Sequence, residues 1–255
     1  MKINRIFLLI VLSFLLPLQL EAITKLARSK GFVYLHEVEP TIQLSLRYNS
    51  NENFLGRPVK GYRKNYCILT RQTAQALKKV QEDVKKDGYC LVVYDAYRPQ
   101  KGVTNFMDWS KDINDQVKKD QYYPRVDKAR VFELGYVAEK SGHSRGSTID
   151  LTLIKLGEKV HDIKVSDRKL MDGFTIKFLD DGTVDMGSSF DLFDVASHYE
   201  NNVIDPVYKE LRTYLKNIME KNGFKNYAEE WWHFTLKNEP YASDKDSSYF
   251  NFAVN

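Results

Sequence analysis

Cysteine is scarce in this chain of 255 residues, because only Cys67 and Cys90 are present. The apolar spacing of residues 70–86 predicts a helix between them, which ends before Gly88. A helix rises 1.5 Å per residue, so the two thiols are expected about 25 Å apart, beyond the reach of a disulfide. We therefore expect both thiols to stay free, even in an oxidising compartment.

Long runs of one charge sign, internal repeats and low-complexity tracts are also missing. The 38 basic and 34 acidic residues are interspersed and give a net charge of +4, which does not support a nucleic-acid partner. The composition, 43% hydrophobic and 28% charged, is that of an ordinary globular chain that can bury one core. We therefore expect a single domain over residues 23–255.

A continuous apolar stretch occurs at the N-terminus. Lys2 and Arg5 precede apolar residues 6–18, and Ala22 is a small residue suited to cleavage. The stretch is shorter than the roughly 20 residues that a membrane-spanning helix needs. We predict a signal peptide over residues 1–22, and hence a periplasmic or secreted protein without stable membrane insertion after cleavage. An uncleaved membrane anchor is the alternative.

The remaining pattern predicts a mixed α and β chain. A short buried strand over residues 91–94 follows the first helix, and a second helix covers residues 100–112. Residues 149–153 alternate with a period of two, so Asp150 is expected to point away from its apolar neighbours. A polar face is what a ligand or catalytic group at Asp150 requires.

The second half of the chain contains a charged, turn-rich stretch. Its Asp-Gly pairs predict an inserted hairpin or loop over residues 154–185. Asp205 as N-cap and Pro206 at the first position predict a helix that ends at Gly223. Residues three apart on a regular strand face opposite sides, so residues 224–236 must bend or bulge if two such residues serve one site.

Two histidines and two carboxylates form a pattern typical of a catalytic metal site. His143 and Asp150 lie in the segment SGHSRGSTID, and His233 ends the segment EWWH. Three nitrogen and oxygen ligands leave a position of the tetrahedron open for a water molecule, whose pKa zinc lowers to about 7. Glu230, three residues before His233, is then the natural general base for that water. This is the layout of a hydrolase.

Four motifs together resemble the D-alanyl-D-alanine dipeptidases of the VanX type. They are YDAYRP from residue 94, SGHSRGSTID from residue 141, DMGSSFD from residue 185 and EWWH from residue 230. The histidine motifs are shared with zinc D,D-carboxypeptidases, cell-wall endopeptidases and hedgehog-type domains, but the other elements favour the dipeptidases. The resemblance implies an α+β fold in which a small, mostly antiparallel central sheet is flanked by helices and carries a zinc site on its face.

The resemblance also implies a role for each matching residue. One Zn²⁺ per chain is bound by His143, Asp150 and His233, Glu230 activates the water, and Arg98 stabilises the oxyanion. The chemistry of Arg98 agrees, because a guanidinium is a fixed cationic fork and the proline after it restricts its backbone to extended conformations. Three further positions are expected near the substrate, with the last of them pairing with its free ammonium: Ser141, Tyr48 and Asp185.

The resulting hypothesis is a periplasmic or secreted zinc metallopeptidase that hydrolyses the dipeptide D-Ala-D-Ala to two D-alanines in cell-wall recycling or scavenging. One alternative is a zinc D,D-carboxypeptidase acting on longer stem peptides, because the long stretch before Asp185 can reshape the entrance to the site. Another is a non-catalytic zinc-binding module. Glu230 and Arg98 together argue against that module, because a structural site needs neither group. Asp191 is expected only to support a loop.

Overall fold

The computed structural model describes residues 23–243 and 245–255, so the predicted signal peptide lies outside the described residues. The helices are α1 (Lys25–Ser29), α2 (Arg71–Lys86), α3 (Gln100–Lys111), α4 (Lys119–Tyr122) and α5 (Pro206–Lys221). The strands are β1 (Phe32–Tyr34), β2 (Gln43–Leu44), β3 (Ile68–Thr70), β4 (Tyr89–Asp95), β5 (Thr148–Lys155), β6 (Lys164–Lys169), β7 (Thr175–Asp180), β8 (Phe224–Tyr227) and β9 (Glu230–Leu236). Short 3-10 turns are η1 (Leu35–Glu37), η2 (Lys128–Arg130), η3 (Gly142–Arg145), η4 (Val195–Ser197) and η5 (Asp246–Ser248).

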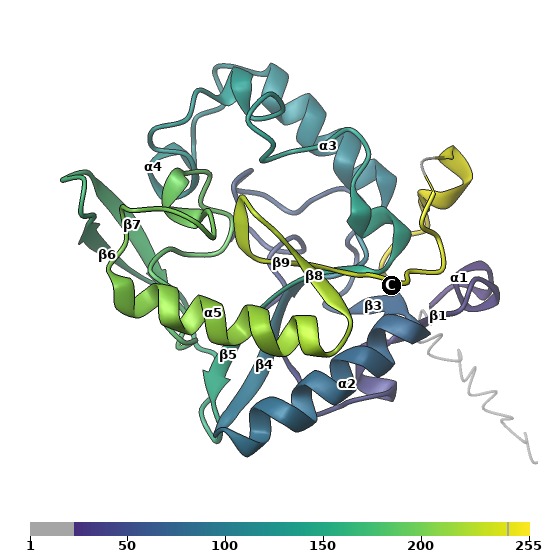
Figure 1. Ribbon diagram of the computed structural model, residues 1–255. Helices are drawn as coiled ribbons and strands as arrows, with labels where there is room; N and C mark the ends of the chain where they lie inside the picture. The colour runs from purple at the N-terminus through teal and green to yellow at the C-terminus, as the bar shows by residue number, and fades with distance from the viewer. Residues whose placement is uncertain (1–22, 244) are drawn as a thin grey trace, which may run out of the picture.

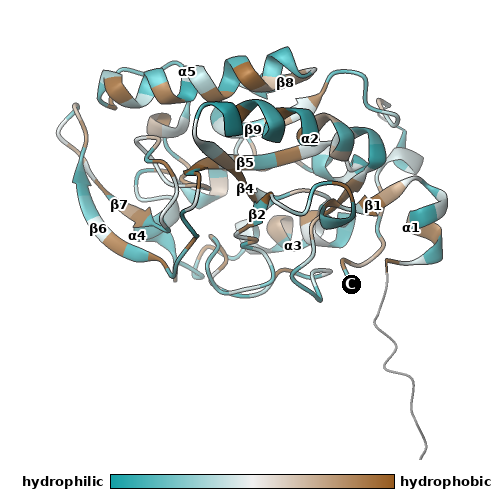
Figure 2. Cartoon of the chain, turned by 90° about the horizontal axis from the view of Figure 1, so that it is seen from below, coloured by the Kyte–Doolittle hydropathy of each residue, from teal (hydrophilic) through white to brown (hydrophobic). Residues whose placement is uncertain are grey.

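A five-stranded sheet with the order β2-β4-β5-β9-β8 forms the centre of the molecule. The β2–β4 pair is parallel, and the other three neighbouring pairs are antiparallel. Helices α2 and α5 cover one face of the sheet, and α3 lies on the other side (Figures 1 and 2). The predicted mixed α+β class is therefore confirmed. In the part of the chain that the structure describes, no helix is long and apolar enough to cross a membrane.

Both long helices begin where the sequence predicts. The helix predicted over residues 70–86 is α2, and Thr70 occupies its N-cap position without a side-chain bond to the helix backbone. The N-cap of α5 is Asp205, which accepts a hydrogen bond from the amide of Val207 at 2.9 Å, and Pro206 takes the first helical position. The buried sides of these two helices supply the apolar layer that rests on the sheet.

Strand β5 is buried on both faces. Ile149, Leu151 and Leu153 belong to the main apolar core, as their alternation predicts. Asp150 lies on the opposite face, but it too is buried, with 2% of its surface exposed. The alternation of apolar residues in the sequence therefore identifies which residues share a face of the strand. It does not show that other segments of the chain cover the polar face.

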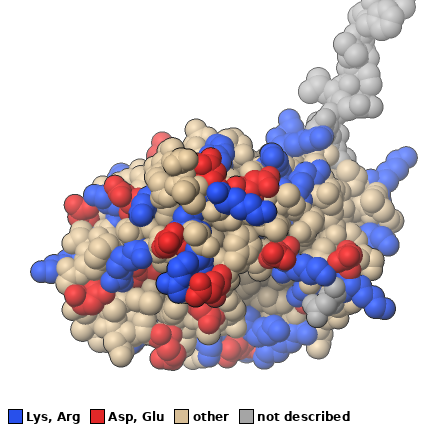
Figure 3. Space-filling view, turned by 90° about the horizontal axis from the view of Figure 1, so that it is seen from above, with Lys and Arg blue, Asp and Glu red and all other residues tan. Residues whose placement is uncertain are grey.

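The predicted inserted hairpin is present as β6 and β7, which pair with each other outside the main sheet. It projects from the side of the molecule next to α4 (Figure 1). Its apolar side packs into a small separate cluster with Leu192 and Ile204. Lysine, arginine and acidic side chains are interspersed over the face seen in Figure 3, as they are along the sequence.

The two cysteines are free and buried, as the sequence predicts. The thiol of Cys90 accepts a hydrogen bond from the side-chain amide of Gln81 at 3.0 Å, on the side of α2 that faces the sheet. Cys67 packs in the main core, where burial raises the pKa of its thiol. Both thiols are therefore structural groups.

Candidate active site

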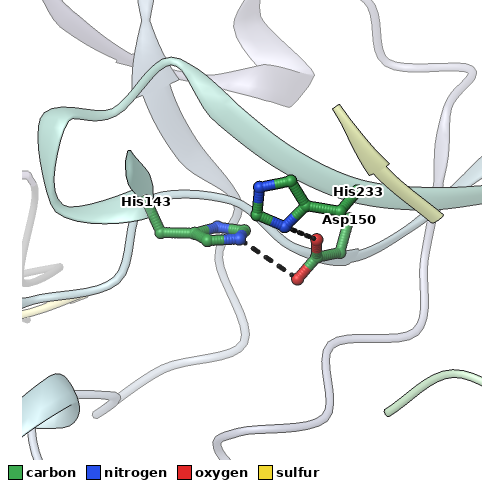
Figure 4. A group of neighbouring side chains, drawn as sticks. All are labelled: His143, Asp150 and His233. Atoms are coloured by element: carbon green, nitrogen blue, oxygen red, sulfur yellow. Dashed lines mark ion pairs between the residues drawn. The ribbon is translucent and has the colours of Figure 1, made fainter. Parts of the chain in front are cut away.

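The three predicted metal ligands meet at the polar face of the sheet. Asp150 of β5 and His233 of β9 are direct partners in the antiparallel register, and His143 lies in the η3 turn that leads into β5. His143 Nε2 lies 3.3 Å from Asp150 Oδ2, and His233 Nδ1 lies 3.1 Å from Asp150 Oδ1 (Figure 4). One ligand atom from each residue lies within 4.8 Å of the other two.

The chemistry of these donor atoms fits a metal ion. His143 Nδ1 contacts the carbonyl oxygen of Ala96 at 2.7 Å, which fixes the ring and turns Nε2 toward the site. His143 Nε2 is buried without a hydrogen-bond partner, which is unfavourable unless another group binds it. Zinc bonds of about 2.0–2.1 Å place neighbouring ligand atoms roughly 3.3 Å apart in a tetrahedron. The separations of 3.3 Å and 3.1 Å run to the two different oxygens of Asp150, so each imidazole lies at about that spacing from one of them.

The electrostatics of the site also favour a cation. Burial alone disfavours a charged imidazole, but hydrogen bonds to Asp150 and Glu230 outweigh it and raise the pKa of His233 to about 10. Burial alone would raise the pKa of Asp150, but the two neighbouring imidazoles outweigh it and hold that pKa below its usual range. Both shifts show that the carboxylates of Asp150 and Glu230 favour positive charge at this point of the site, which a metal ion would also supply.

Glu230 and His233 reach the same site because their strand pairing is irregular. The register of β8 and β9 shifts between Asn226 and Tyr227, which provides the expected bulge. The side-chain amide of Asn226 donates to the carbonyl oxygens of Glu230 at 3.1 Å and of His233 at 3.0 Å. Glu230 Oε2 consequently lies 3.2 Å from His233 Nδ1. The carboxylate is beside the three ligands but is not one of them.

Arg98 points at the metal ligands from the end of β4. Its Nη2 lies 3.0 Å from Asp95 Oδ2 and 3.7 Å from Asp150 Oδ2. The guanidinium carbon lies 5.0 Å from the ring centre of Tyr48 and 4.9 Å from that of Phe106. Asp95 therefore orients Arg98 through an ion pair while the guanidinium still faces the site.

The turn that carries His143 packs closely against β5. Ser141 is the N-cap of η3, and its hydroxyl accepts a hydrogen bond from the amide of His143 at 3.3 Å. A Cβ at Gly142 would lie 2.5 Å from the hydroxyl oxygen of Thr148, which itself bonds Thr235 at 2.9 Å. The small residue between serine and histidine is therefore required by the close approach of these segments.

A cavity of about 220 Å³ opens beside the metal ligands. This volume is below the roughly 300–1,000 Å³ of sites for drug-sized ligands, so it suits a small molecule. Ser141 and Tyr48, which the sequence predicts near the substrate, line the cavity. Among the described residues, none from the β6–β7 hairpin lines it, so the inserted hairpin does not form its entrance.

Asp185, which the sequence predicts near the substrate, does not line this cavity. Its carboxylate pairs with Arg168 of β6, with one contact of 2.7 Å, and also accepts a hydrogen bond from the amide of Gly187 at 2.9 Å. The first aspartate of the DMGSSFD motif thus closes a turn and binds the hairpin. The negative charge of the Asp185 carboxylate is thus compensated by Arg168.

Asp191, the last residue of the same motif, takes the place expected for Asp185. It lines the cavity with 5% of its surface exposed, and its Oδ2 accepts a hydrogen bond from the hydroxyl of Tyr48 at 2.8 Å. Burial, helped by the charge of Asp150, raises its pKa well above the usual range. Its φ of 61° is the one positive value outside glycine in the described chain. In the sequence, the only feature that points to Asp191 is its place in the DMGSSFD motif.

The chain is similar to D-Ala-D-Ala dipeptidases along most of its length. The family model Peptidase_M15, described as D-ala-D-ala dipeptidase, matches residues 28–162 and 170–255. The unmatched residues 163–169 fall in the stretch where the sequence predicted an insertion, and they include β6.

Named relatives support the same family. The D-alanyl-D-alanine dipeptidase of Enterococcus faecium is 38% identical over 88% of this chain and 98% of the relative. The enzyme of that name from Streptomyces coelicolor is 35% identical with the same coverage, and the one from Escherichia coli is 28% identical over 80% of this chain and 83% of the relative. A solved zinc complex of the D,D-pentapeptidase VanY gives a TM-score of 0.37 at 13% identity, covering 69% of this chain and 77% of that one, and supports no argument.

Proposed function

The chain belongs to the D-Ala-D-Ala dipeptidases of the Peptidase_M15 family, and we propose that its cavity hydrolyses D-Ala-D-Ala to two D-alanines with one zinc ion bound by His143, Asp150 and His233. The observation that carries this proposal is the cavity itself, which is lined by the three ligands, Glu230 and Asp191. A site of this size and polarity suits a substrate with two charged ends.

Glu230 is the proposed general base. When bound, zinc supplies Lewis-acid activation of the scissile carbonyl and of the attacking water. Glu230 accepts a proton from that water at Oε2 and passes it to the nitrogen of the leaving amine. Oε2 lies 3.2 Å from His233 Nδ1, so the carboxylate lies directly beside the ligand set.

Arg98 is proposed to stabilise the negative charge that forms on the carbonyl oxygen in the transition state. Its ion pair with Asp95 and its contact with the rings of Tyr48 and Phe106 fix the guanidinium before the substrate arrives. A donor that is already oriented does not need to reorganise during the reaction, which is why such groups contribute strongly to catalysis.

Asp191 is proposed to bind the free ammonium of the dipeptide. Its buried carboxylate, held by the Tyr48 hydroxyl, gains a cationic partner when that ammonium binds. A longer peptide has a neutral amide at this point and would leave the carboxylate buried without a charge partner, which is unfavourable. The site therefore favours a dipeptide over the longer stem peptides of a carboxypeptidase. Among the described residues, none of the hairpin that suggested the carboxypeptidase lines the cavity.

We also infer an exported enzyme with one domain over residues 23–255. The export rests on the predicted signal peptide, and the single domain is supported by the main apolar core, whose residues run from Val33 to Phe234. Removal of D-Ala-D-Ala before its incorporation into wall precursors takes place in the cytoplasm, so an exported dipeptidase fits recycling or scavenging of wall fragments. Fractionation of cells tests this inference, and activity confined to the cytoplasm would overturn it.

The direct test is a hydrolysis assay on three substrates, with metal content measured on the same sample. They are D-Ala-D-Ala, L-Ala-L-Ala and a pentapeptide stem that ends in D-Ala-D-Ala. The proposal expects hydrolysis of D-Ala-D-Ala and at least about tenfold lower kcat/KM for the pentapeptide, which has no ammonium beside the scissile residue. Activity on the pentapeptide alone would establish the carboxypeptidase instead.

A further inference from the structure

Arg212 of α5 lies beneath the segment that carries Asp191, and only 1% of its surface is exposed. We call residues 186–198 the Asp191 loop. The guanidinium of Arg212 donates four hydrogen bonds, and every acceptor belongs to this loop. They are the carbonyl oxygens of Met186 at 2.7 Å, Ala196 at 2.8 Å and His198 at 2.9 Å, and the hydroxyl of Ser188 at 3.1 Å.

This arginine differs from Arg47, which is also buried, and from Arg98, which is half-buried. Arg47 pairs with Asp181 and Arg98 with Asp95, whereas no carboxylate oxygen among the described residues lies within 4.0 Å of the Arg212 nitrogens. Arginine stays protonated in proteins, so its buried charge depends on the oxygens that surround it. The loop supplies those oxygens, so a displacement of the loop removes the hydrogen bonds that stabilise the buried charge.

The contacts of Arg212 join the two ends of the Asp191 loop. Two acceptors lie at residues 186–188 and two at residues 196–198, so one rigid, planar guanidinium spans both ends. Asp191 lies between them. Its left-handed backbone conformation is unfavourable for an aspartate unless the surrounding structure imposes it. Fixing the loop ends is a direct way to impose it.

The same contacts set the loop against the catalytic strand. Ser188 Oγ also accepts a hydrogen bond from Trp231 Nε1 at 3.0 Å, and the Arg212 guanidinium lies 5.7 Å from the ring centre of Trp231. Trp231 follows Glu230 directly in β9. Arg212 thus connects the segment that holds Asp191 with the strand that holds the general base.

We propose that Arg212 is a positioning residue for substrate recognition, which holds the Asp191 carboxylate where the free ammonium of the dipeptide binds. Arg212 does not line the cavity, so it acts through the loop and does not touch the substrate. The inference rests on the proposed function, because it assigns the ammonium to Asp191.

The test measures binding of D-Ala-D-Ala by calorimetry in a Glu230→Gln background, where turnover does not interfere. Arg212→Met removes the four hydrogen bonds while keeping an unbranched apolar chain. The matched control is Lys128→Met, because Lys128 is also a buried cation whose ammonium binds only backbone carbonyls at 2.7 Å and lies over the ring of Trp109. Lys128 does not line the cavity. Hydrogen exchange across residues 186–198 is measured on the same samples.

Arg212→Met is expected to raise the Kd about tenfold or more, because a small misplacement of a binding group is sufficient for such a loss. It should also speed exchange of the Asp191 loop, while Lys128→Met changes neither. In an Asp191→Asn background, Arg212→Met should add little further loss, because both changes act on one interaction. An equal loss in that background, or a Kd equal to that of the control, would overturn the proposal.

Failure of the proposed function gives a different result. If the Glu230→Gln parent itself does not bind D-Ala-D-Ala, the assignment of the dipeptide is wrong. In that case hydrogen exchange by itself decides the role of Arg212. Faster exchange of residues 186–198 in Arg212→Met than in the Lys128→Met control supports the positioning role. Equal exchange in the two variants overturns it.

Discussion

Two walls of the cavity hold their functional groups in different ways. On the strand wall, Asp150 and His233 are paired across β5 and β9, Glu230 begins β9, and His143 lies in the η3 turn before β5. On the loop wall, Asp191 lies in an irregular segment with a left-handed backbone. The chemical groups are thus set by strand register, and the groups expected to recognise the substrate are set by loop contacts.

This difference predicts how each wall fails. A slip of one residue in the β5–β9 register would turn Asp150 or His233 to the opposite face, so the metal site is either complete or lost. The loop wall depends on individual side-chain contacts, such as Tyr48 with Asp191, and can weaken in steps. Changes on the strand wall should therefore affect kcat most, and changes on the loop wall should affect KM.

The largest effect is expected on the strand wall, at Glu230. Glu230→Gln keeps the shape of the side chain but removes the base, so kcat should fall at least about 10³-fold. Zinc content should stay at the wild-type value, because the three ligands are intact. Steady-state kinetics and metal analysis on one sample check this, and a variant that keeps a tenth of the activity would remove Glu230 from the mechanism.

The next effect is expected at Arg98, between the two walls. Arg98→Met should lower kcat about 10²- to 10³-fold and change KM only a few-fold, because the charge it stabilises exists only in the transition state. Arg98→Lys should restore little, since an ammonium cannot reproduce the fork that contacts Asp95 through two nitrogens. If Arg98→Met raised KM and left kcat unchanged, Arg98 would act in substrate binding, as the residues of the loop wall do, and not in the transition state.

The two aspartates of the DMGSSFD motif provide the comparison within the loop wall. Asp191→Asn should raise KM for D-Ala-D-Ala about 10- to 100-fold, the loss expected for a charged hydrogen bond of about 1.5–3 kcal/mol. Asp185→Asn serves as the control, because Asp185 pairs with Arg168 away from the cavity, and its KM should change less than about twofold. The opposite ranking would return the ammonium site to Asp185.

The smallest effect is expected in the inserted hairpin. Arg168→Gln breaks the ion pair of β6 with Asp185, which is partly exposed, so the free energy of unfolding should fall by about 1 kcal/mol or less. The kcat/KM should remain unchanged, because among the described residues the hairpin contributes nothing to the cavity wall. Thermal unfolding and kinetics check both parts, and a large change in KM would show that the hairpin shapes the site after all.

The sequence was informative for the strand wall because ligand identity and spacing are local properties. The pattern around His143 and Asp150 predicted residues that the fold brings within 3.3 Å of each other, and the spacing of Glu230 and His233 predicted a bulge that the register shift provides. The helices, the free cysteines and the inserted hairpin were predicted for the same reason, since each depends on nearby residues.

The loop wall could not be predicted in the same way. The DMGSSFD motif contains two aspartates, and only tertiary packing decides that Asp185 binds Arg168 while Asp191 reaches the cavity. The bond between Tyr48 and Asp191 joins residues far apart in the sequence, and a positive φ at an aspartate has no sequence signal. Arg212 likewise looks like an ordinary polar residue of a helix until its acceptors are seen.

Zinc titration of metal-stripped protein tests the central claim most directly, with hydrolysis of D-Ala-D-Ala measured against bound zinc. The account predicts that activity rises in proportion to zinc and stops rising at one ion per chain, and that His233→Ala neither binds zinc tightly nor hydrolyses the dipeptide. Full activity in the metal-stripped protein, or one tightly bound zinc per chain in His233→Ala, would contradict it.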